Sequence, residues 1–253
     1  MAYYKQFTLG VFLSAEAEVR ERVWRLLEER GVARFPLPVK GRIPNFAGAE
    51  EAASRLRSSD EYQAARVVKV NPDSPQRPVR LMALQDGKLL VMPTPRIRSG
   101  FLLLDPSRIP KGMVSQASTI SGAFRLGLQV HPRDLPRIDL IVIGSVAVTP
   151  SGWRVGKGEG YAELEYGILR SFGKVDGSTP IFTTVHELQL VEDLPREPFD
   201  VPVDAIFTER RAIRCPPNPK PEGIYWELLD ERKLEEIPLL QEMRRTFYRR
   251  ELL

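Results

Sequence analysis

At 253 residues the chain is long enough to bury a full hydrophobic core, and its hydrophobic content of 42% is ordinary for a globular protein. No apolar run approaches the ~18 residues of a membrane span, and no small-residue cleavage site follows residues 7–13, so neither a membrane helix nor a signal peptide is predicted. The 37 basic and 33 acidic residues leave a net charge of +4, which suits an anionic ligand but does not by itself indicate nucleic acid. The single cysteine, Cys215, excludes an intrachain disulfide and favours a reducing, cytoplasmic location.

Two helices are predicted in the N-terminal part. Ser14 is a favourable N-cap residue for a helix that runs to Arg30, and Gly31 ends it. The apolar side chains that share one face of this helix are Val19, Val23, Leu26 and Leu27. A shorter helix is expected over residues 48–57, after a basic stretch that contains Lys40 and Arg42.

The next residues predict a βαβ unit. A β-branched strand over 65–70 is followed by turn residues that open a helix to about Gln85, and a second strand covers 89–92. Further apolar runs occur at residues 101–104, 140–143, 181–184 and 203–207. These runs are continuous rather than alternating, which is typical of parallel strands covered on both faces. The sequence therefore predicts an α/β protein with a mostly parallel sheet.

The C-terminal part reads as a helical appendage. One helix is expected near residues 230–236, and Pro238 opens another that carries a basic tail over 244–250. A proline-rich span over 215–221 separates these helices from the body. We therefore expect an α/β domain over residues 1–215 and a C-terminal helical extension over 216–253.

Three glycines at alternate positions, Gly156, Gly158 and Gly160, follow the strand over 140–143 and precede a helix expected near Tyr161. Such spacing lets the backbone approach a ligand closely and turn successive N–H groups toward an anion at a helix N-terminus. The pattern is neither a Walker A sequence nor a dinucleotide fingerprint, and a glycine-lined turn would produce it equally well. Two cations, Arg154 and Lys157, favour phosphate binding.

Carboxylates follow these cations at Glu159, Glu163 and Glu165. Acidic residues in the first turn stabilise the positive end of a helix, which explains all three without a ligand. One carboxylate beside bound phosphate is also what Mg²⁺ requires, and Glu163 is our candidate for the metal ligand.

Two other side chains, His186 and Cys215, are of types that can take part in catalysis. His186 follows the predicted strand over 181–184, where α/β sheets form ligand crevices, but a single histidine is more often a hydrogen-bonded structural residue. Cys215 lies between Arg214 and Pro216 with no histidine nearby in sequence, so we expect an inert thiol.

Two sequence blocks resemble the 5-formyltetrahydrofolate cyclo-ligase (methenyltetrahydrofolate synthetase) family. The matching residues of the first block are Gly152, Arg154, Gly156, Gly158, Gly160 and Tyr161. Those of the second block are Gln189, Leu194, Pro195, Asp200, Val201, Asp204, Thr208 and Glu209. The order and spacing of the two blocks are specific for the superfamily.

The chain departs from the family pattern at two places, the end of the glycine loop and the family's substrate motif. After Tyr161 the family's Tyr, Asp and Arg are replaced by Ala162, Glu163 and Leu164, and its Glu-Xaa-Asp-Thr motif is replaced by residues 71–76. The N-terminal half is similar to a divergent branch, the methenyltetrahydrofolate-synthetase-domain-containing proteins. Features of the ATP site are thus retained better than those of the folate site.

The resemblance implies a three-layer α/β sandwich like that of ribose-phosphate isomerases and CoA transferases. It also implies an ATP- and Mg²⁺-dependent ligase of one-carbon folate metabolism, which converts 5-formyltetrahydrofolate to 5,10-methenyltetrahydrofolate. In that function Arg154 and Tyr161 would be catalytic, and Glu163 would bind the metal. Residues Gly156, Lys157, Gly158, Glu159, Gly160 and Tyr161 would hold ATP. Lys40, Arg42 or an arginine of the N-terminal helix would also reach the triphosphate.

Two other functions stay open at this point. A non-catalytic nucleotide- or phosphate-binding module of the same fold would retain the glycine loop without turnover. A nucleic-acid-binding protein would use the basic arm over 244–250, although basic helix ends are usually solvated faces. The expected partners are a folate-like small molecule and ATP rather than nucleic acid or a membrane, and the sequence leaves the oligomeric state open.

Overall fold

The computed structural model describes the backbone of residues 2–251 and the side chains of residues 15–246. Its centre is an eight-stranded sheet whose neighbouring strands β11, β10, β7, β3 and β4 are parallel. In spatial order the strands are β12 (Ala212–Arg214), β11 (Ala205–Phe207), β10 (Ile181–Thr184), β7 (Leu140–Val142), β3 (Val67–Val70), β4 (Leu89–Pro93), β5 (Phe101–Leu104) and β6 (Leu128–Val130). Two small antiparallel pairs join β1 (Ala33–Arg34) to β2 (Asn45–Phe46) and β8 (Ala147–Val148) to β9 (Arg154–Val155).

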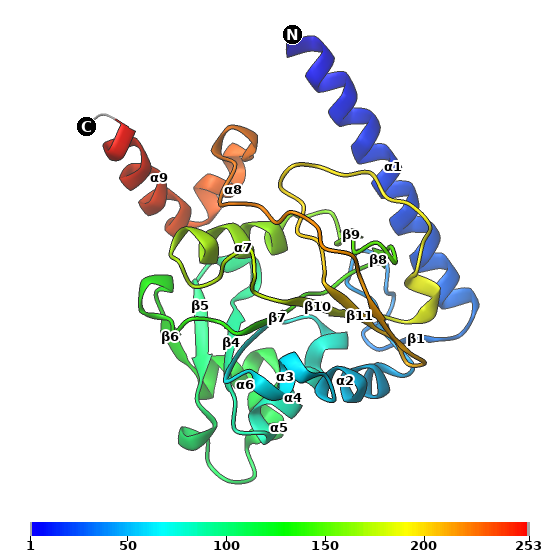
Figure 1. Ribbon diagram of the computed structural model, residues 1–253, viewed down its shortest axis with the longest axis vertical. Coiled ribbons are helices and arrows are strands. Elements are labelled where there is room, and N and C mark those ends of the chain that lie inside the picture. The colour runs from blue at the N-terminus through cyan, green and yellow to red at the C-terminus, as the bar shows by residue number, and fades with distance from the viewer. Residues whose placement is uncertain (1, 252–253) are drawn as a thin grey trace.

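Helices cover both faces of the sheet, so the fold is a three-layer α/β sandwich (Figure 1). One layer contains α2 (Ala49–Arg57), α3 (Asp60–Ala64), α4 (Arg77–Gln85), α5 (Val114–Ala117) and α6 (Ile120–Leu126). The other contains α7 (Tyr161–Ser171), α8 (Glu231–Glu236) and α9 (Pro238–Glu251). Short 3-10 turns are η1 (Ser74–Gln76), η2 (Pro95–Ile97), η3 (Pro106–Arg108), η4 (Pro132–Asp134), η5 (Glu187–Gln189) and η6 (Trp226–Leu228).

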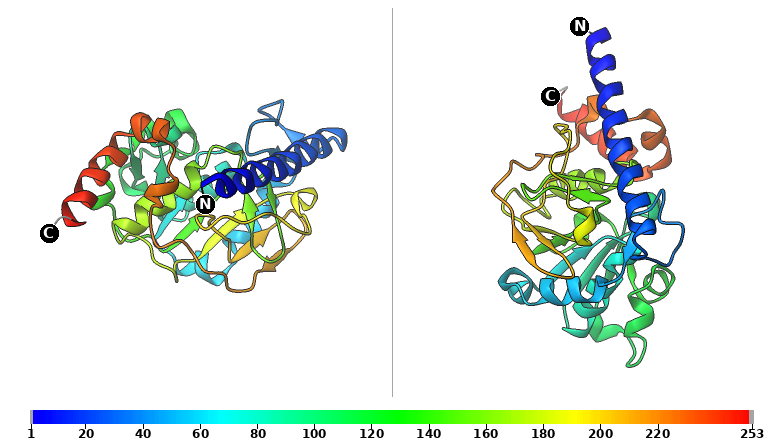
Figure 2. Two further views of the ribbon diagram at one scale, coloured as in Figure 1. Left: turned by 90° about the horizontal axis from the view of Figure 1, so that it is seen from above. Right: turned by 90° about the vertical axis from the view of Figure 1, so that its right-hand side faces the viewer.

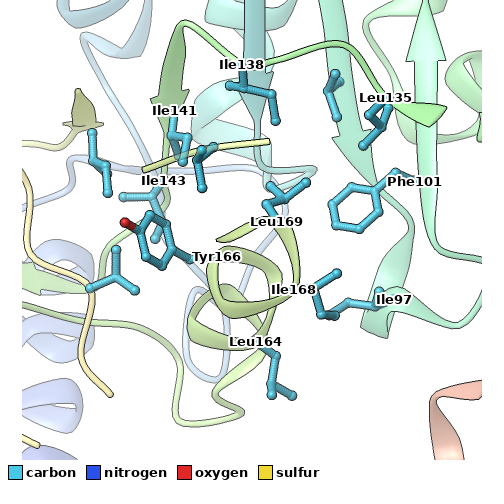
Figure 3. Packing of buried hydrophobic residues seen from close by; sticks show 14 of the residues in the cluster. Ile97, Phe101, Leu135, Ile138, Ile141, Ile143, Leu164, Tyr166, Ile168 and Leu169 are labelled. Atoms are coloured by element: carbon cyan, nitrogen blue, oxygen red, sulfur yellow. The ribbon is translucent and has the colours of Figure 1, made fainter. Parts of the chain in front are cut away.

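Successive residues of the central strands belong to the two different cores. Val68 and Val70 pack toward α2 and α4, whereas Val67 packs toward the α7 side. Figure 3 shows the core on the α7 side, in which Leu169 of α7 lies between Ile141 of β7 and Phe101 of β5. Burial on both faces explains why the strands are continuous apolar runs, as the sequence predicted.

The direction predicted for one strand is wrong. β5 was expected to be parallel but pairs antiparallel with β4. Only residues 94–100 connect the two strands, and a parallel crossover needs a dozen residues or more. The short connection therefore forces an antiparallel return.

The predicted start of the first helix is also wrong. α1 spans Ala2–Glu29, so Ser14 lies inside the helix instead of capping it. The residues before Ser14 include no proline, and a serine within a helix costs little, so nothing there ends the helix. Gly31 follows with φ of 65° as predicted. The first turns of α1 project beyond the body in Figure 1 and in the right-hand view of Figure 2.

The C-terminal helices are fixed to the body by apolar contacts. Leu234 of α8, Ile237 at its C-cap and Leu240 of α9 belong to the same buried cluster as α7. This packing places α8 beside the start of α7 (Figure 1). Within residues 2–251 no helix is long and apolar enough to cross a membrane.

The strand order contains a topological switch. From β3 the chain first builds β4, β5 and β6 on one side, and then returns to add β7 on the other side of β3. The connections after β3 and β7 therefore diverge at the carboxyl edge of the sheet, where α/β proteins bind ligands.

Candidate functional site

A cavity of about 310 Å³ opens at this switch point. Its floor is the segment after β3, residues 71–74, together with Gly144 after β7. The glycine loop and the first residues of α7 form one wall, and Arg42 and Arg96 line the mouth. A cavity of this size, with converging polar groups, fits a small-molecule ligand.

Most of the residues predicted for the site meet in this cavity. Those that line it are Arg154, Gly156, Lys157, Glu159, Gly160, Tyr161 and Glu163. Gly158 is exposed on the loop, outside the cavity wall. The helix start predicted near Tyr161 is confirmed, because α7 begins at that residue.

The backbone of the loop needs glycine at two positions. Gly158 has φ of 94° and Gly160, the N-cap of α7, has φ of 65°. Both values lie in the left-handed region, which residues with a Cβ adopt only with strain. The loop therefore enters α7 through a conformation that leaves the first N–H groups of the helix without side-chain caps.

At each of the three glycines a cationic side chain lies close to the position that a Cβ would take. The nearest atoms are Arg154 Nη2 at 2.8 Å from Gly156, Arg20 Cζ at 3.3 Å from Gly158, and Lys233 Nζ at 2.7 Å from Gly160. These cations come from β9, α1 and α8, three separate parts of the chain. They lie beside the N-terminus of α7, whose partial positive charge has the same sign.

Arg154 is the most buried of these cations, with a side chain only 1% exposed. Its Nη1 donates to Glu163 Oε1 at 2.6 Å. Its Nε–H is buried and meets no acceptor among the described residues. An unpartnered buried N–H is costly, so an acceptor from a ligand would be stabilising here.

The other loop charges form ion pairs. Lys157 Nζ lies 2.8 Å from Glu159 Oε2, and the second Glu159 oxygen lies 3.6 Å from Arg96 Nη2. Arg20, buried at the base of α1, pairs with Glu16 at 2.8 Å. Arg20 is the N-terminal helix arginine that reaches the loop.

A buried ion pair that the sequence analysis missed lies below the loop. Lys69 of β3 donates to Glu165 Oε2 and to Asn71 Oδ1, both at 2.5 Å. Burial raises the pKa of the Glu165 carboxyl, and Lys69 opposes that shift. Glu165 is therefore not a first-turn residue that stabilises the helix end. The sequence did contain an indication of this pair, because Lys69 is the one charged residue within the apolar run Val67–Val70.

The segment that replaces the family's Glu-Xaa-Asp-Thr motif supplies acceptors. A Cβ at Gly144 would lie 3.1 Å from both Asp73 Oδ2 and Gln76 Oε1. Gln76 is fully buried, and its Oε1 has no hydrogen-bond donor among the described residues. Burial raises the pKa of Asp73, although Lys157, Arg80 and Lys69 oppose the shift. Of these two side chains only Asp73 lines the cavity, where its carboxyl offers an acceptor to a ligand that carries N–H donors.

A buried arginine holds that segment in place. Arg80 Nη1 donates to the carbonyl oxygens of Asn71 at 2.5 Å and Asp73 at 2.9 Å, and its Nε donates to Ser118 O at 2.8 Å. Three backbone acceptors thus compensate for burial of the guanidinium.

Other sequence candidates lie elsewhere. Lys40 pairs with Glu21 at the surface, at 2.8 Å. The side chain of His186 accepts a hydrogen bond from Leu188 N through Nδ1, packs edge-on against Phe46, and does not line the cavity. The prediction of an inert thiol agrees with the raised pKa of Cys215, about 11, which is caused chiefly by burial. Among the described side chains no group of three or more His, Cys, Asp or Glu residues could hold a metal ion.

The protein has a three-layer α/β fold, and a loop lined by cations borders the cavity at the carboxyl edge of its sheet. Residues 14–209 match the 5-formyltetrahydrofolate cyclo-ligase family, and the chain belongs to this family. The family resemblance and the fold class predicted from the sequence are therefore confirmed.

Individual relatives agree with this assignment. The chain is 41% identical over 237 residues to a mouse methenyltetrahydrofolate synthase domain-containing protein, covering 91% of this chain and 63% of that protein. The human protein of the same name is 39% identical over 237 residues, covering 91% of this chain and 61% of that protein. The chain thus spans somewhat less than two thirds of the length of these curated relatives.

A solved structure shows the same fold. A 5,10-methenyltetrahydrofolate synthetase from Aquifex aeolicus aligns with a TM-score of 0.50 and 21% identity, covering 84% of this chain and 98% of that chain. At that identity the likeness concerns the fold alone.

Proposed function

We propose that the protein is an ATP- and Mg²⁺-dependent cyclo-ligase that converts 5-formyltetrahydrofolate to 5,10-methenyltetrahydrofolate. The observation that carries this proposal is the buried, unpartnered Nε–H of Arg154 on the cavity wall, beside a loop whose three alternate glycines each face a cation. Phosphate oxygens are the acceptors that such an array stabilises.

In this reaction the γ-phosphoryl group of ATP passes to the formyl oxygen of the folate, and ADP leaves. N10 then attacks the activated formyl carbon, the C–O bond breaks, phosphate carries away the oxygen, and N10 loses its proton. Arg154 and the loop N–H groups would stabilise the charge on the transferred group, as positioned donors do in phosphoryl transfer. Tyr161, at the start of α7, would orient the reacting groups on the cavity wall. Asp73, which lines the cavity, would accept a hydrogen bond from an N–H group of the folate ring.

The residues present fit a Mg²⁺ ion bound through Glu163. Its Oε1 accepts from Arg154, and its Oε2 takes no part in that ion pair. Mg²⁺ is commonly held by one or two carboxylates together with substrate phosphates, so no larger acidic cluster is needed. When bound, Mg²⁺ would neutralise negative charge on the phosphate oxygens.

Calorimetric titration with Mg·ATP, followed by an ultraviolet assay for methenyltetrahydrofolate, tests the proposal. We expect binding and turnover in the native protein, and loss of both in Arg154→Met. Arg108→Met is the matched control, because Arg108 is 79% exposed and pairs only with its neighbour Asp105. Absence of ATP binding in the native protein would contradict the proposal.

The second candidate function is a nucleotide-binding module without turnover. The observation that favours it is Ala162, which lines the cavity where the family carries a tyrosine. Binding of Mg·ATP without formation of methenyltetrahydrofolate would select this function.

A further inference from the structure

The C-terminal segment beyond the family-matched residues contributes a side chain to the glycine loop. Asp230 caps α8 by accepting from Arg232 N at 3.0 Å, and Leu234 and Ile237 anchor the helix in the core shared with α7. Tyr161 adds a direct link, since its hydroxyl donates to Glu236 at 3.3 Å. α8 is therefore held against the loop on two sides, and Lys233 lies between these anchors.

Lys233 is placed over the residues that open α7. Its Nζ is 2.7 Å from the position of a Cβ at Gly160 and 5.5 Å from the centre of the Tyr161 ring. Gly160 and Tyr161 both line the cavity. The absence of a side chain at Gly160 thus makes room for an ammonium group.

Lys233 differs from the other cations at the loop in having no anionic partner. Arg154, Arg20 and Lys157 each form an ion pair with a carboxylate. Within the described residues, no carboxylate oxygen lies within 4.0 Å of Lys233 Nζ, and no hydrogen bond satisfies it.

The burial and the charges around Lys233 favour binding of an anion. Burial lowers the pKa of its ammonium, and Glu163, Asp230 and Glu159 oppose that shift. A half-buried ammonium that has an aromatic ring but no anion beside it is stabilised when an anion binds. The cavity wall beside it is the surface on which the phosphates of a nucleotide would lie.

We propose that Lys233 is a nucleotide-binding residue, through which the C-terminal helix α8 completes the phosphate site at the glycine loop. This inference rests on the proposed function of the loop. It adds to that function a residue outside the segment 14–209 that matches the family. A chain ending before α8 would have the glycine loop but lack one of its cations.

Calorimetric titration of the full chain with Mg·ATP tests this inference. Lys233→Met should weaken ATP binding about tenfold or more, as loss of a charged hydrogen-bond partner does. Lys233→Arg should stay within a few-fold of the native protein. Arg232→Gln is the matched control, because Arg232 lies next in the same helix with an 86% exposed side chain, and it should leave affinity unchanged.

A protection experiment on the native protein avoids any folding defect of the variants. Mg·ATP should protect Lys233 from reductive methylation, as read by peptide mass spectrometry, whereas exposed Lys111 should react equally with and without ATP. Native affinity in Lys233→Met or equal labelling of Lys233 would overturn the inference while leaving the loop's function intact. A native protein that binds no ATP would overturn both.

Discussion

Lys69 of β3 and Glu165 of α7 form a buried ion pair that ties the central strand to the helix of the site, with 2.5 Å between Nζ and Oε2. Both side chains are under 10% exposed, and Glu165 lines the cavity. Buried pairs are costly to break but not always stabilising as a whole.

Lys69→Met should therefore lower the free energy of unfolding by about 3–5 kcal/mol, because it leaves Glu165 buried and unpaired. The double variant Lys69→Met with Glu165→Leu should recover most of that loss. Urea unfolding of the single and double variants measures both changes. If the double variant loses as much stability as Lys69→Met and Glu165→Leu together, the two side chains are not energetically coupled, which would contradict this prediction.

Gly160→Ala should lower the affinity for Mg·ATP in addition to lowering the free energy of unfolding. The left-handed backbone costs an alanine about 1–2 kcal/mol, and the new methyl group would also displace the flexible end of Lys233. Gly173→Ala is the matched control, since Gly173 has φ of 66° with no atom within 4 Å of its Cβ position. Unfolding titrations should show similar losses of stability for Gly160→Ala and Gly173→Ala. Calorimetric titrations with Mg·ATP should show reduced affinity only for Gly160→Ala. Unchanged affinity in Gly160→Ala would argue against the role of this loop position.

Glu163→Gln should raise the Mg²⁺ concentration needed for half-maximal turnover by about tenfold or more, because it removes the proposed metal ligand's charge. Glutamine can still accept from Arg154, so we expect the fold to survive. Glu51→Gln, on the exposed side of α2 in the opposite layer, serves as the control. A Mg²⁺ dependence identical in Glu163→Gln and the native protein would exclude Glu163 as a ligand.

Asp200 should make the stability of the protein depend on pH. Burial raises its pKa to about 7, with Glu163 and Glu16 adding to the shift. Between about pH 4 and pH 7 the folded state therefore holds a proton that the unfolded state has lost, and stability falls by about 1.4 kcal/mol per pH unit as pH rises. Above pH 7 this contribution no longer changes.

Asp200→Asn should remove that slope, so its stability relative to the native protein should rise from pH 5 to pH 7 and then stay constant. Urea unfolding at four pH values measures the difference. Asp193→Asn, at an exposed position of the same loop, should leave the native slope unchanged. Parallel pH profiles for Asp200→Asn and the native protein would rule out this assignment.

Local patterns were enough to predict much of the fold. The apolar runs of β3, β4, β7, β10 and β11 are continuous, which is typical of parallel strands in a sheet covered by helices on both faces. The glycine loop and the start of α7 followed from spacing alone. The direction of β5 depends instead on the length of one connection.

The parts of the site that could not be predicted are contacts between distant segments. Nothing near Gly160 in the sequence indicates that Lys233 fills the space beside it, and nothing in α1 indicates that Arg20 would pack against Gly158. The charge within β3 was visible, but its partner Glu165 was not. Such pairs are determined by packing of the layers rather than by local propensity.

The three cations that lie beside the glycines come from distant parts of the chain, which has a consequence for synthesis of the protein. Arg20 and Arg154 leave the ribosome with or before the glycine loop, whereas α8 emerges only after the last strands of the sheet. A nascent chain would thus lack one of these cations until α8 docks. Under the proposed role of Lys233, full affinity for nucleotide would come only with that docking, and ATP would favour it.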